Sequence, residues 1–212
     1  MTDWAEIGVV AGDDGLARCG WCMPAPDYTA YHDDEWGRPV IDDVRLYEKI
    51  CLEGFQSGLS WLTILRKREG FRRAFAGFEP AVVAGYGPAD VERLMADAAI
   101  VRHRGKIEAT IANAGATLLA QERHGSLAAL VWSFEPVRAG RAVPGRLGDL
   151  QSVTAESTAL AKALRKLGFR FVGPTTAYAA MESLGLVNDH LAGCGVRDAC
   201  EEDRRRHPSP IP

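Results

Sequence analysis

The sequence predicts an all-α fold. Apolar residues recur at helical spacing in several segments, residues that cap helices stand in front of them, and no stretch shows the sustained two-residue alternation of a half-buried strand. The chain has 212 residues, of which 47% are hydrophobic and 25% are charged, as is usual for a globular protein. This length suits one sizeable domain or two small ones that share a core.

The first strongly patterned helix is expected from about Val44 to Cys51 or slightly beyond, because Asp42 or Asp43 can serve as its N-cap. Ile50 and Glu53 fall on one face of this helix. A carboxylate in line with an apolar stripe must be desolvated, paired or functional, because burying an unpaired charge is costly. Glu53 is therefore a candidate functional side chain.

A loop is expected next, over residues 54–61 (GFQSGLSW). Its two glycines let the backbone approach a ligand closely, and Ser60 is a suitable N-cap for a helix that runs to about Glu69. A carboxylate, aromatic faces and an exposed glycine backbone are the features that a pocket for a flat, nitrogen-rich ring needs.

The rest of the chain reads as helices with one long loop. Further helices are expected over Asp90–Asp97, over His103–Ala120, over Ser126–Phe134, from Thr154 to a stop at Gly168, and over Ala177–Leu184. Residues 135–152 are rich in Pro, Gly and Arg and are expected to form an exposed loop. Residues 1–17 are expected to be a flexible extension and residues 195–212 a tail. The folded part, 18–194, is then either one compact unit or two helical lobes with a pocket between them.

Two of these helices meet at a short hairpin, residues 169–176, with a glycine at each end. This is a helix-hairpin-helix pattern. The N–H groups of its loop at Gly173, and of the second helix near Thr175, form an anion site that suits a DNA phosphate. Many helical proteins carry such hairpins without binding DNA. The short basic clusters at 66–68, 102–106 and 165–170 are likewise typical of solvated helix ends.

Four side chains form a candidate metal site. Cys19 and His32 lie near the start of the chain, and His190 and Cys194 lie near its end at a spacing that one helical turn can present on one face. Together they form a Cys2His2 set suited to one tetrahedral zinc ion. Four protein ligands leave no position for water, which indicates a structural ion that joins the two ends of the chain.

The other cysteines leave alternatives open. Cys22 forms a C-x2-C pair with Cys19 and could replace one ligand, the four residues could be buried thiols and ordinary surface histidines, and Cys51 and Cys200 stay unassigned. Five cysteines in a chain without a secretory signal are better interpreted as thiols or metal ligands than as disulfides. No apolar run is long enough to span a bilayer, so we expect a cytoplasmic protein. A net charge of −3 argues mildly against a non-specific nucleic-acid coat.

An ordered set of short strings resembles the family of 3-methyladenine DNA glycosylase I, a bacterial alkylation-repair family. The strings are 18–21 (RCGW), 28–37 (YTAYHDDEWG), 50–54 (ICLEG), 58–61 (GLSW), 102–107 (RHRGKI), 131–134 (VWSF), 168–173 (GFRFVG) and 187–190 (VNDH). They occur in family order and span roughly residues 18–194. Any single string could arise by chance, but the ordered set is specific.

The resemblance implies a helix-hairpin-helix DNA glycosylase fold in which Cys19, His32, His190 and Cys194 hold a structural zinc ion. It also implies roles in the site. Glu53 contacts the excised base, the turn at Gly58 and Leu59 fills the gap left in the DNA, and four aromatic residues line the base pocket. These four are Trp21, Tyr28, Tyr31 and Trp61. The family does not generally need Cys22, the first 17 residues or Arg204–Arg206.

The activity expected from the resemblance is hydrolysis of the N-glycosidic bond of 3-methyladenine, with 3-methylguanine as a further candidate, in double-stranded DNA. No lysine near Asn188 is placed to form a Schiff base, so strand cleavage is not expected. The wider superfamily commonly has a catalytic aspartate in this region. Asn188 cannot act as a base, and Asp189 is a candidate for orienting His190, so the activator of water is left open.

Two other functions stay in view. A zinc-dependent hydrolase of a small molecule would need an open metal position beside a carboxylate. A non-catalytic helix-hairpin-helix DNA-binding module would not need Glu53. We expect a monomer whichever function holds.

Overall fold

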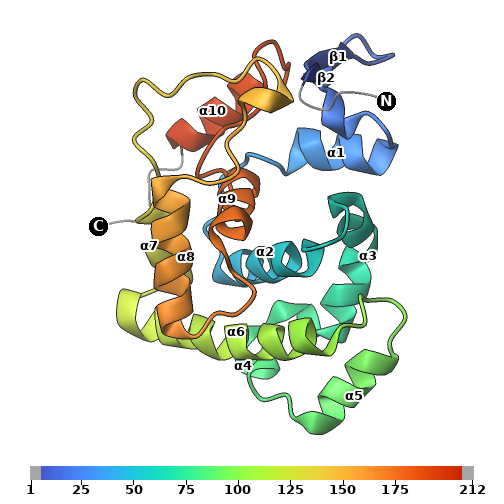
Figure 1. The fold of residues 1–212 in the computed structure, drawn as a ribbon, viewed down its shortest axis with the longest axis vertical. Coiled ribbons are helices and arrows are strands. Elements are labelled where there is room, and N and C mark those ends of the chain that lie inside the picture. The colour runs from blue at the N-terminus through green and yellow to red at the C-terminus, as the bar shows by residue number, and fades with distance from the viewer. Residues whose placement is uncertain (1–5, 207–212) are drawn as a thin grey trace. The chain divides into compact units, whose positions relative to one another are not determined.

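The computed structural model describes residues 6–206, and these form a mostly helical protein (Figure 1). The predicted all-α class is confirmed, with one small two-stranded sheet added to it. The described residues divide into two compact units. Residues 6–39, 135–152 and 181–206 form what we call the terminal unit, and residues 40–134 and 153–180 form the central unit. Among residues 6–206, no helix has the length and apolar character needed to cross a bilayer.

The terminal unit contains β1 (Val9–Ala11), β2 (Ala17–Cys19), the short 3-10 helix η2 (Gly20–Cys22), α1 (Pro26–Asp34), η4 (Leu147–Asp149) and α10 (Arg197–Arg206). The central unit contains α2 (Asp43–Gln56), α3 (Trp61–Ala74), η3 (Ala76–Phe78), α4 (Pro80–Val83), α5 (Pro88–Ala96), α6 (Arg104–His124), α7 (Leu127–Trp132) and α8 (Ala155–Leu167). Helix α9 (Pro174–Ser183) begins in the central unit and ends in the terminal unit.

The predicted N-terminal extension is folded over the residues that the structure describes. β1 and β2 pair as an antiparallel hairpin in which Val9 lies opposite Cys19. Three-residue strands are too short for a two-residue alternation to be visible in the sequence, so the hairpin was not predicted. Residues 1–5 lie outside the described part. The hairpin leads directly into Cys19, one of the four candidate metal ligands.

The predicted C-terminal tail also differs, because residues 197–206 form α10. Cys200 and Arg204 are buried on one face of this helix. The guanidinium of Arg204 donates to the carbonyl of Leu186 at 2.8 Å and to the Glu135 carboxylate at 3.2 Å. The helix is so rich in charge that its short buried face is hard to recognise in the sequence. Residues 207–212 lie outside the described part.

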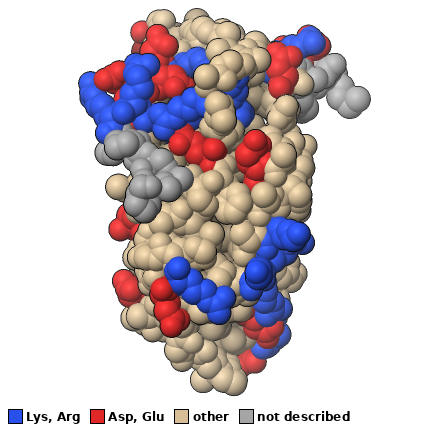
Figure 2. Space-filling view, turned by 90° about the vertical axis from the view of Figure 1, so that its left-hand side faces the viewer, with Lys and Arg blue, Asp and Glu red and all other residues tan. Residues whose placement is uncertain are grey.

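The exposed arginines of α10 are paired with acids of the same helix. Arg205 and Arg206 both donate to Glu202, at 2.6 Å and 3.0 Å respectively. Figure 2 shows blue basic and red acidic side chains next to one another on one face of the molecule. Helix α10, the last described part of the chain, therefore balances its exposed positive charges with acids of its own.

The core of the central unit lies between α2 and α6, which run side by side (Figure 1). Tyr47 of α2 is buried, and its hydroxyl donates to the carbonyl of Thr110 in α6 at 2.8 Å. Phe55 and Phe71 pack with ring centroids 4.5 Å apart. The Asp43 carboxylate accepts hydrogen bonds from the first backbone N–H groups of α7, so α2 caps its neighbour.

Most predicted helix starts are confirmed. The side chains of four N-cap residues each accept a hydrogen bond from the backbone N–H three positions further on; these residues are Asp42, Ser60, Ser126 and Thr154. Gly168 adopts a left-handed conformation and ends α8 as predicted. The predicted loop over residues 54–61 is shorter than expected, because α2 continues to Gln56 and α3 begins at Trp61.

Candidate functional site

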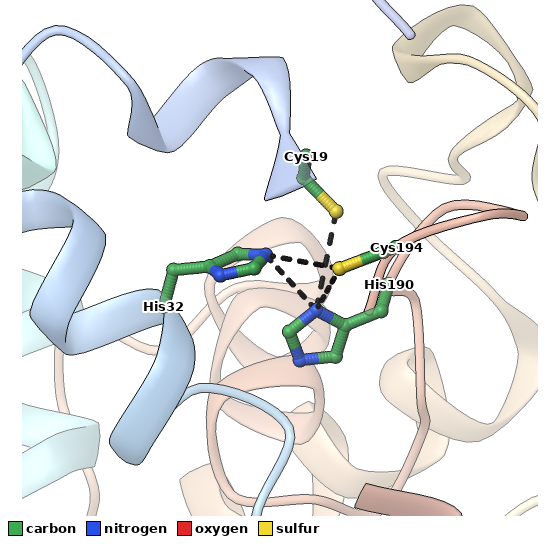
Figure 3. Close-up of side chains that lie close together, drawn as sticks. All are labelled: Cys19, His32, His190 and Cys194. Carbon is green, nitrogen blue, oxygen red and sulfur yellow. Dashed lines mark hydrogen bonds between the residues drawn. The ribbon is translucent and has the colours of Figure 1, made fainter. Parts of the chain in front are cut away.

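Four buried side chains of the terminal unit converge on one point (Figure 3). They are Cys19, His32, His190 and Cys194, and their ligand atoms all lie within 4.8 Å of one another. Cys19 ends β2, His32 lies on α1, and the other two come from the segment before α10. Of the described residues, these are the ones that meet; Cys22 is buried in η2 but is not a member of this group. Spacing in the sequence predicted this set.

The separations within the cluster match tetrahedral zinc. Bonds of about 2.0–2.1 Å to nitrogen and about 2.3 Å to sulfur place two nitrogens about 3.3 Å apart, and a nitrogen and a sulfur about 3.6 Å apart. The Nε2 atom of His32 lies 3.1 Å from Nδ1 of His190. The Sγ atom of Cys194 lies 3.6 Å and 3.5 Å from these two nitrogens, and Cys19 Sγ lies 3.9 Å from His190 Nδ1.

The outer nitrogens of both histidines are held by acceptors. Nδ1 of His32 lies 2.7 Å from the Asp33 carboxylate, and Nε2 of His190 lies 3.0 Å from the carbonyl oxygen of Trp36. Because a carbonyl and a carboxylate accept, the ring protons belong on these outer nitrogens. The two inner nitrogens lie 3.1 Å apart, and in a metal-bound form each would offer its lone pair to the same cation.

The charges of the cluster also favour a cation. Burial opposes protonation of His32, but hydrogen bonds to Cys194, Cys22 and Asp33 raise the pKa of His32 overall, to about 10. The Cys19 thiol donates to the sulfur of Cys194 and lowers the pKa of Cys194 well below its ordinary value. Without an ion, the proton on the inner nitrogen of His32 and the thiolate of Cys194 stabilise each other, and a bound cation would take the place of that proton.

An ion-paired network extends from the cluster to the N-terminal hairpin. The buried guanidinium of Arg18 donates to Asp33 at 2.8 Å and to Asp14 at 2.7 Å. Asp33 in turn contacts His32, so Arg18 and Asp33 together fix the orientation of a candidate ligand. The sequence analysis missed this role, although the position of Asp33 directly after His32 was a usable signal.

One detail of the predicted site is wrong. His190 and Cys194 are not presented by a helical turn; they lie on a non-helical turn in which the N–H of Cys194 donates to the carbonyl of Leu191 at 3.0 Å. Gly193 has a positive φ of 84°, which a helix does not allow. The turn brings both side chains to the same point by a different route.

Asn188 and Asp189 have structural partners in the terminal unit. Asn188 is buried, donates to the carbonyl of Arg197 and accepts from the N–H of His190. The Asp189 carboxylate accepts from Arg141 at 2.8 Å. Asn188 thus holds the backbone of His190, and the suggestion that Asp189 orients His190 stays a prediction.

Three of the predicted base-binding aromatics cluster near η2 and α1 in the terminal unit. The ring centroids of Trp21 and Tyr28 lie 4.9 Å apart in an edge-to-face arrangement, and Tyr28 stacks on Tyr31 at 6.5 Å. Trp21 also contacts His32 edge-on at 5.2 Å. Trp21 thus connects the aromatic group to the candidate metal cluster through its contact with His32.

Glu53 and Trp61 lie in the central unit, on α2 and at the start of α3. Glu53 is 5% exposed, as its place on an apolar stripe predicted. Its carboxylate lies 3.4 Å from the ammonium of Lys49, one helical turn earlier. The same ammonium lies 3.6 Å from the centre of a Trp61 ring, a cation–π contact. Lys49 is therefore a local cation beside Glu53.

The turn between α2 and α3 presents an apolar side chain to solvent. Leu59 is 42% exposed, and residues 57–60 are exposed along their whole length. Gly58 has a φ of 84°, in the left-handed region that favours glycine. The N–H of Leu59 donates to the carbonyl of Gln56 at 2.6 Å, and Ser60 then starts α3. The geometry suits the predicted wedge.

The predicted hairpin lies in the central unit between α8 and α9. Asn113 of α6 fixes it, because its side chain accepts from the N–H of Arg170 at 2.7 Å and donates to the carbonyl of Arg170 at 3.2 Å. The next residue, Phe171, is 40% exposed and has a φ of 55°, which is rare for a bulky residue. Gly173 precedes the N-terminus of α9, so the first N–H groups of that helix, near Thr175, are available to an anion.

A cleft of about 640 Å³ in the central unit lies elsewhere, among the ends of α6, α7 and α8. Its lining includes Leu130, Phe134 and Leu167 and contains none of the predicted site residues. It has no evident part in the chemistry described below.

These features are those of a helix-hairpin-helix DNA glycosylase. They are a helical fold, a hairpin that suits phosphate, an apolar wedge, and a buried acid near a tryptophan. Comparison with known proteins agrees. The family model described as methyladenine glycosylase matches residues 21–198. The chain therefore belongs to the methyladenine glycosylase family.

Named relatives support this assignment along most of the chain. The chain is 49% identical over 179 residues to DNA-3-methyladenine glycosylase 1 of Escherichia coli (strain K12), covering 84% of this chain and 96% of that protein. It is 44% identical to DNA-3-methyladenine glycosylase of Haemophilus influenzae, covering 84% and 96%.

Solved structures are similar in fold as well. A crystal structure of 3-methyladenine DNA glycosylase I superimposes with a TM-score of 0.80 at 48% identity, covering 84% of this chain and 98% of that one. A structure that addresses 3-methyladenine recognition by the enzyme from Staphylococcus aureus gives 0.81 at 36% identity, covering 85% and 96%.

Proposed function

We propose that this protein is a monofunctional DNA glycosylase that hydrolyses the N-glycosidic bond of 3-methyladenine in alkylated double-stranded DNA, with 3-methylguanine as a further candidate substrate. The observation that carries the proposal is Glu53, a buried carboxylate in a chain of the methyladenine glycosylase family. Its ion-pair partner Lys49 lies over the ring of Trp61. The names of the relatives, which act on 3-methyladenine, support the choice of base.

Recognition of the base would use charge and aromatic faces. A base inside a duplex must first be flipped out, at a cost of about a few kcal/mol that is smaller for a damaged base. We assign the gap-filling wedge to Leu59, because it is apolar and exposed on a short turn. A 3-methylated adenine is cationic, so the Glu53 carboxylate would complement its charge and accept a hydrogen bond from its exocyclic amine. Neutral adenine would gain less from the same group.

The resemblance supports a place in the base pocket for Trp21, Tyr28 and Tyr31 as well as Trp61. Aromatic faces attract cations and stack on flat rings. For this lesion, binding can supply much of the catalysis, because the positive charge already makes the base a good leaving group.

The chemical step needs little acid assistance. As the bond between C1′ of the sugar and the base breaks, its electron pair moves onto the cationic base, which leaves as neutral 3-methyladenine. Water adds to the cationic sugar at C1′ and releases a proton to solvent. The protein contributes electrostatic stabilisation of the sugar cation.

We further propose that Cys19, His32, His190 and Cys194 hold one structural zinc ion. Their separations and the orientation of both imidazoles support this assignment. A bound ion would join strands and turns from both ends of the chain and add its binding free energy to folding. Four protein ligands leave no position for a reacting water, so the alternative of a zinc-dependent small-molecule hydrolase is disfavoured. The expected cytoplasmic location and monomeric state stay predictions.

Base release from methylated DNA tests the proposed function. Wild-type protein is expected to release 3-methyladenine and to leave 7-methylguanine on the DNA, with free bases separated by chromatography. Glu53→Gln should release the base much more slowly. The matched control is Glu48→Gln, because Glu48 is also a buried acid of α2 but pairs with Arg72 at 2.8 Å. The control should lose stability and keep base release.

The other outcomes separate the readings. Equal loss in both variants would assign the effect to helix stability and remove Glu53 from the site. Absence of any base release by folded, zinc-loaded wild type would refute the glycosylase proposal and favour the non-catalytic DNA-binding module.

A further inference from the structure

Lys106 is a buried cation whose ammonium reaches the end of another helix. It lies on the first turn of α6 and is 7% exposed. Its Nζ donates to the carbonyl oxygen of Phe55 at 2.9 Å and to that of Ser57 at 2.6 Å. Within residues 6–206, no carboxylate lies at ion-pair distance from it, and burial alone lowers the pKa of this lysine. Backbone carbonyls therefore provide the compensation for burying its charge.

The two carbonyls belong to the C-terminal end of α2, where the last carbonyl groups of a helix lack helical partners. Gly54 accepts from the N–H of Ser57, and Gln56 accepts from the N–H of Leu59. The carbonyls of Phe55 and Ser57 point instead at Lys106. A positive charge at this helix end also interacts favourably with the helix dipole.

These contacts fix the backbone on which the wedge stands. Ser57 and Gly58 are exposed. Gly58 has a left-handed backbone conformation, and an unrestrained glycine would populate many other backbone conformations as well. Two anchors hold the turn: the Lys106 ammonium on its N-terminal side and the Ser60 cap of α3 on its C-terminal side. Leu59 lies between the two anchors.

We propose that Lys106 is a positioning residue for base flipping, which orders the turn at residues 57–60 so that Leu59 enters the DNA stack without first losing conformational freedom. This role rests on the proposed glycosylase function. It predicts a specific failure: loss of the ammonium should impair the extraction of a base from a duplex and should spare the pocket that binds the free base.

The test uses Lys106→Met, which keeps an unbranched side chain that is one atom shorter and removes the ammonium and its charge. Lys67→Met is the matched control, because the ammonium of Lys67 also donates to a backbone carbonyl, that of Ala98 at 2.8 Å, away from the turn. Both zinc-loaded variants are compared with wild type for release of 3-methyladenine from methylated duplex DNA and from single-stranded DNA of the same sequence that is methylated as a single strand and never heated. Binding of free 3-methyladenine is measured in parallel.

Lys106→Met is expected to reduce kcat/KM on duplex DNA about tenfold or more, the factor that corresponds to one lost buried polar interaction. Activity on the single-stranded DNA and binding of the free base should change less than about threefold. Leu59→Ala should show the same pattern, and adding Lys106→Met to it should cause little further loss, because both act on one step. Equal losses on both substrates, or full additivity, would overturn the proposal.

Amide hydrogen exchange gives a readout that does not depend on the activity. The peptide that covers residues 55–60 should exchange faster in Lys106→Met than in Lys67→Met, while the rest of α2 stays protected. If wild type releases no base but the turn exchanges faster in Lys106→Met, the glycosylase proposal fails and the ordering of the turn by Lys106 stands. Unchanged protection of this peptide would refute the ordering role even in an active enzyme.

Discussion

Replacement of Asn113 by leucine should weaken the hairpin before it affects the rest of the central unit. The amide of Asn113 is buried and makes both backbone hydrogen bonds of Arg170, one as acceptor at 2.7 Å and one as donor at 3.2 Å. Leucine has a similar shape but leaves one N–H and one carbonyl without these partners. Each unsatisfied buried group costs about 1–3 kcal/mol. Because the loop is partly exposed and water can reach it, we expect a total of about 2–3 kcal/mol.

The assay is urea unfolding of the zinc-loaded protein, followed by circular dichroism, together with binding of undamaged duplex DNA by fluorescence anisotropy. Thr117→Val is the control, because the Thr117 hydroxyl is buried on the same helix and donates only within it, to the carbonyl of Asn113 at 2.9 Å. This control should cost less than about 1 kcal/mol and leave DNA binding unchanged. A stability of Asn113→Leu within about 0.5 kcal/mol of wild type, with unchanged DNA affinity, would refute the argument.

Three further predictions concern the metal, the thiols and the C-terminal helix. Asp33→Ala should weaken zinc affinity roughly 10–100-fold in competition with a chromophoric chelator, because Asp33 orients His32; wild-type affinity would show that it does not. Burial raises the pKa of Cys51 to about 12, so its protonated form stabilises the fold fully below its ordinary pKa of about 8.5, and this contribution falls as the pH rises towards 12. Between pH 9 and 10.5 the free energy of unfolding of Cys51→Ala should therefore fall less steeply than that of wild type, by about 1.4 kcal/mol per pH unit, and parallel slopes would contradict this. Arg204→Met should lower the free energy of unfolding by about 3–5 kcal/mol, because it leaves buried partners unpaired. Arg205→Met should be nearly neutral in the same urea titration. Similar losses in the two variants would show that the buried contacts of Arg204 contribute no more to stability than a surface ion pair.

Local signals predicted the framework of the central unit well. Capping residues act on the N–H groups a few positions further on, so Ser60 and Thr154 could be recognised from the sequence alone. The burial of Glu53 followed from its place on an apolar stripe. The four candidate zinc ligands could be selected because their chemistry is distinctive, although the sequence could not show that a non-helical turn presents His190 and Cys194.

Contacts between distant segments could not be predicted in this way. Lys106 looked like one member of a basic cluster at a helix end, and only the fold shows its ammonium at the carbonyls of Phe55 and Ser57. Asn113 carries no local signal, because its partner lies 57 positions further along the chain. The buried face of α10 was hidden for a related reason: Arg204 is buried by its partners, and composition alone suggests an exposed tail.

The spacing of Lys106 and Asn113 along α6 has a consequence for how the family can vary. Seven residues are almost two helical turns, so both side chains leave α6 on nearly the same side, about 10 Å apart along its axis. One reaches the wedge turn and the other reaches the hairpin. An inserted or deleted residue between them would rotate one anchor by about 100° relative to the other. Changes of length should therefore accumulate in the connecting loops of related proteins and be excluded from this stretch of helix, even though most of it touches no DNA-facing loop.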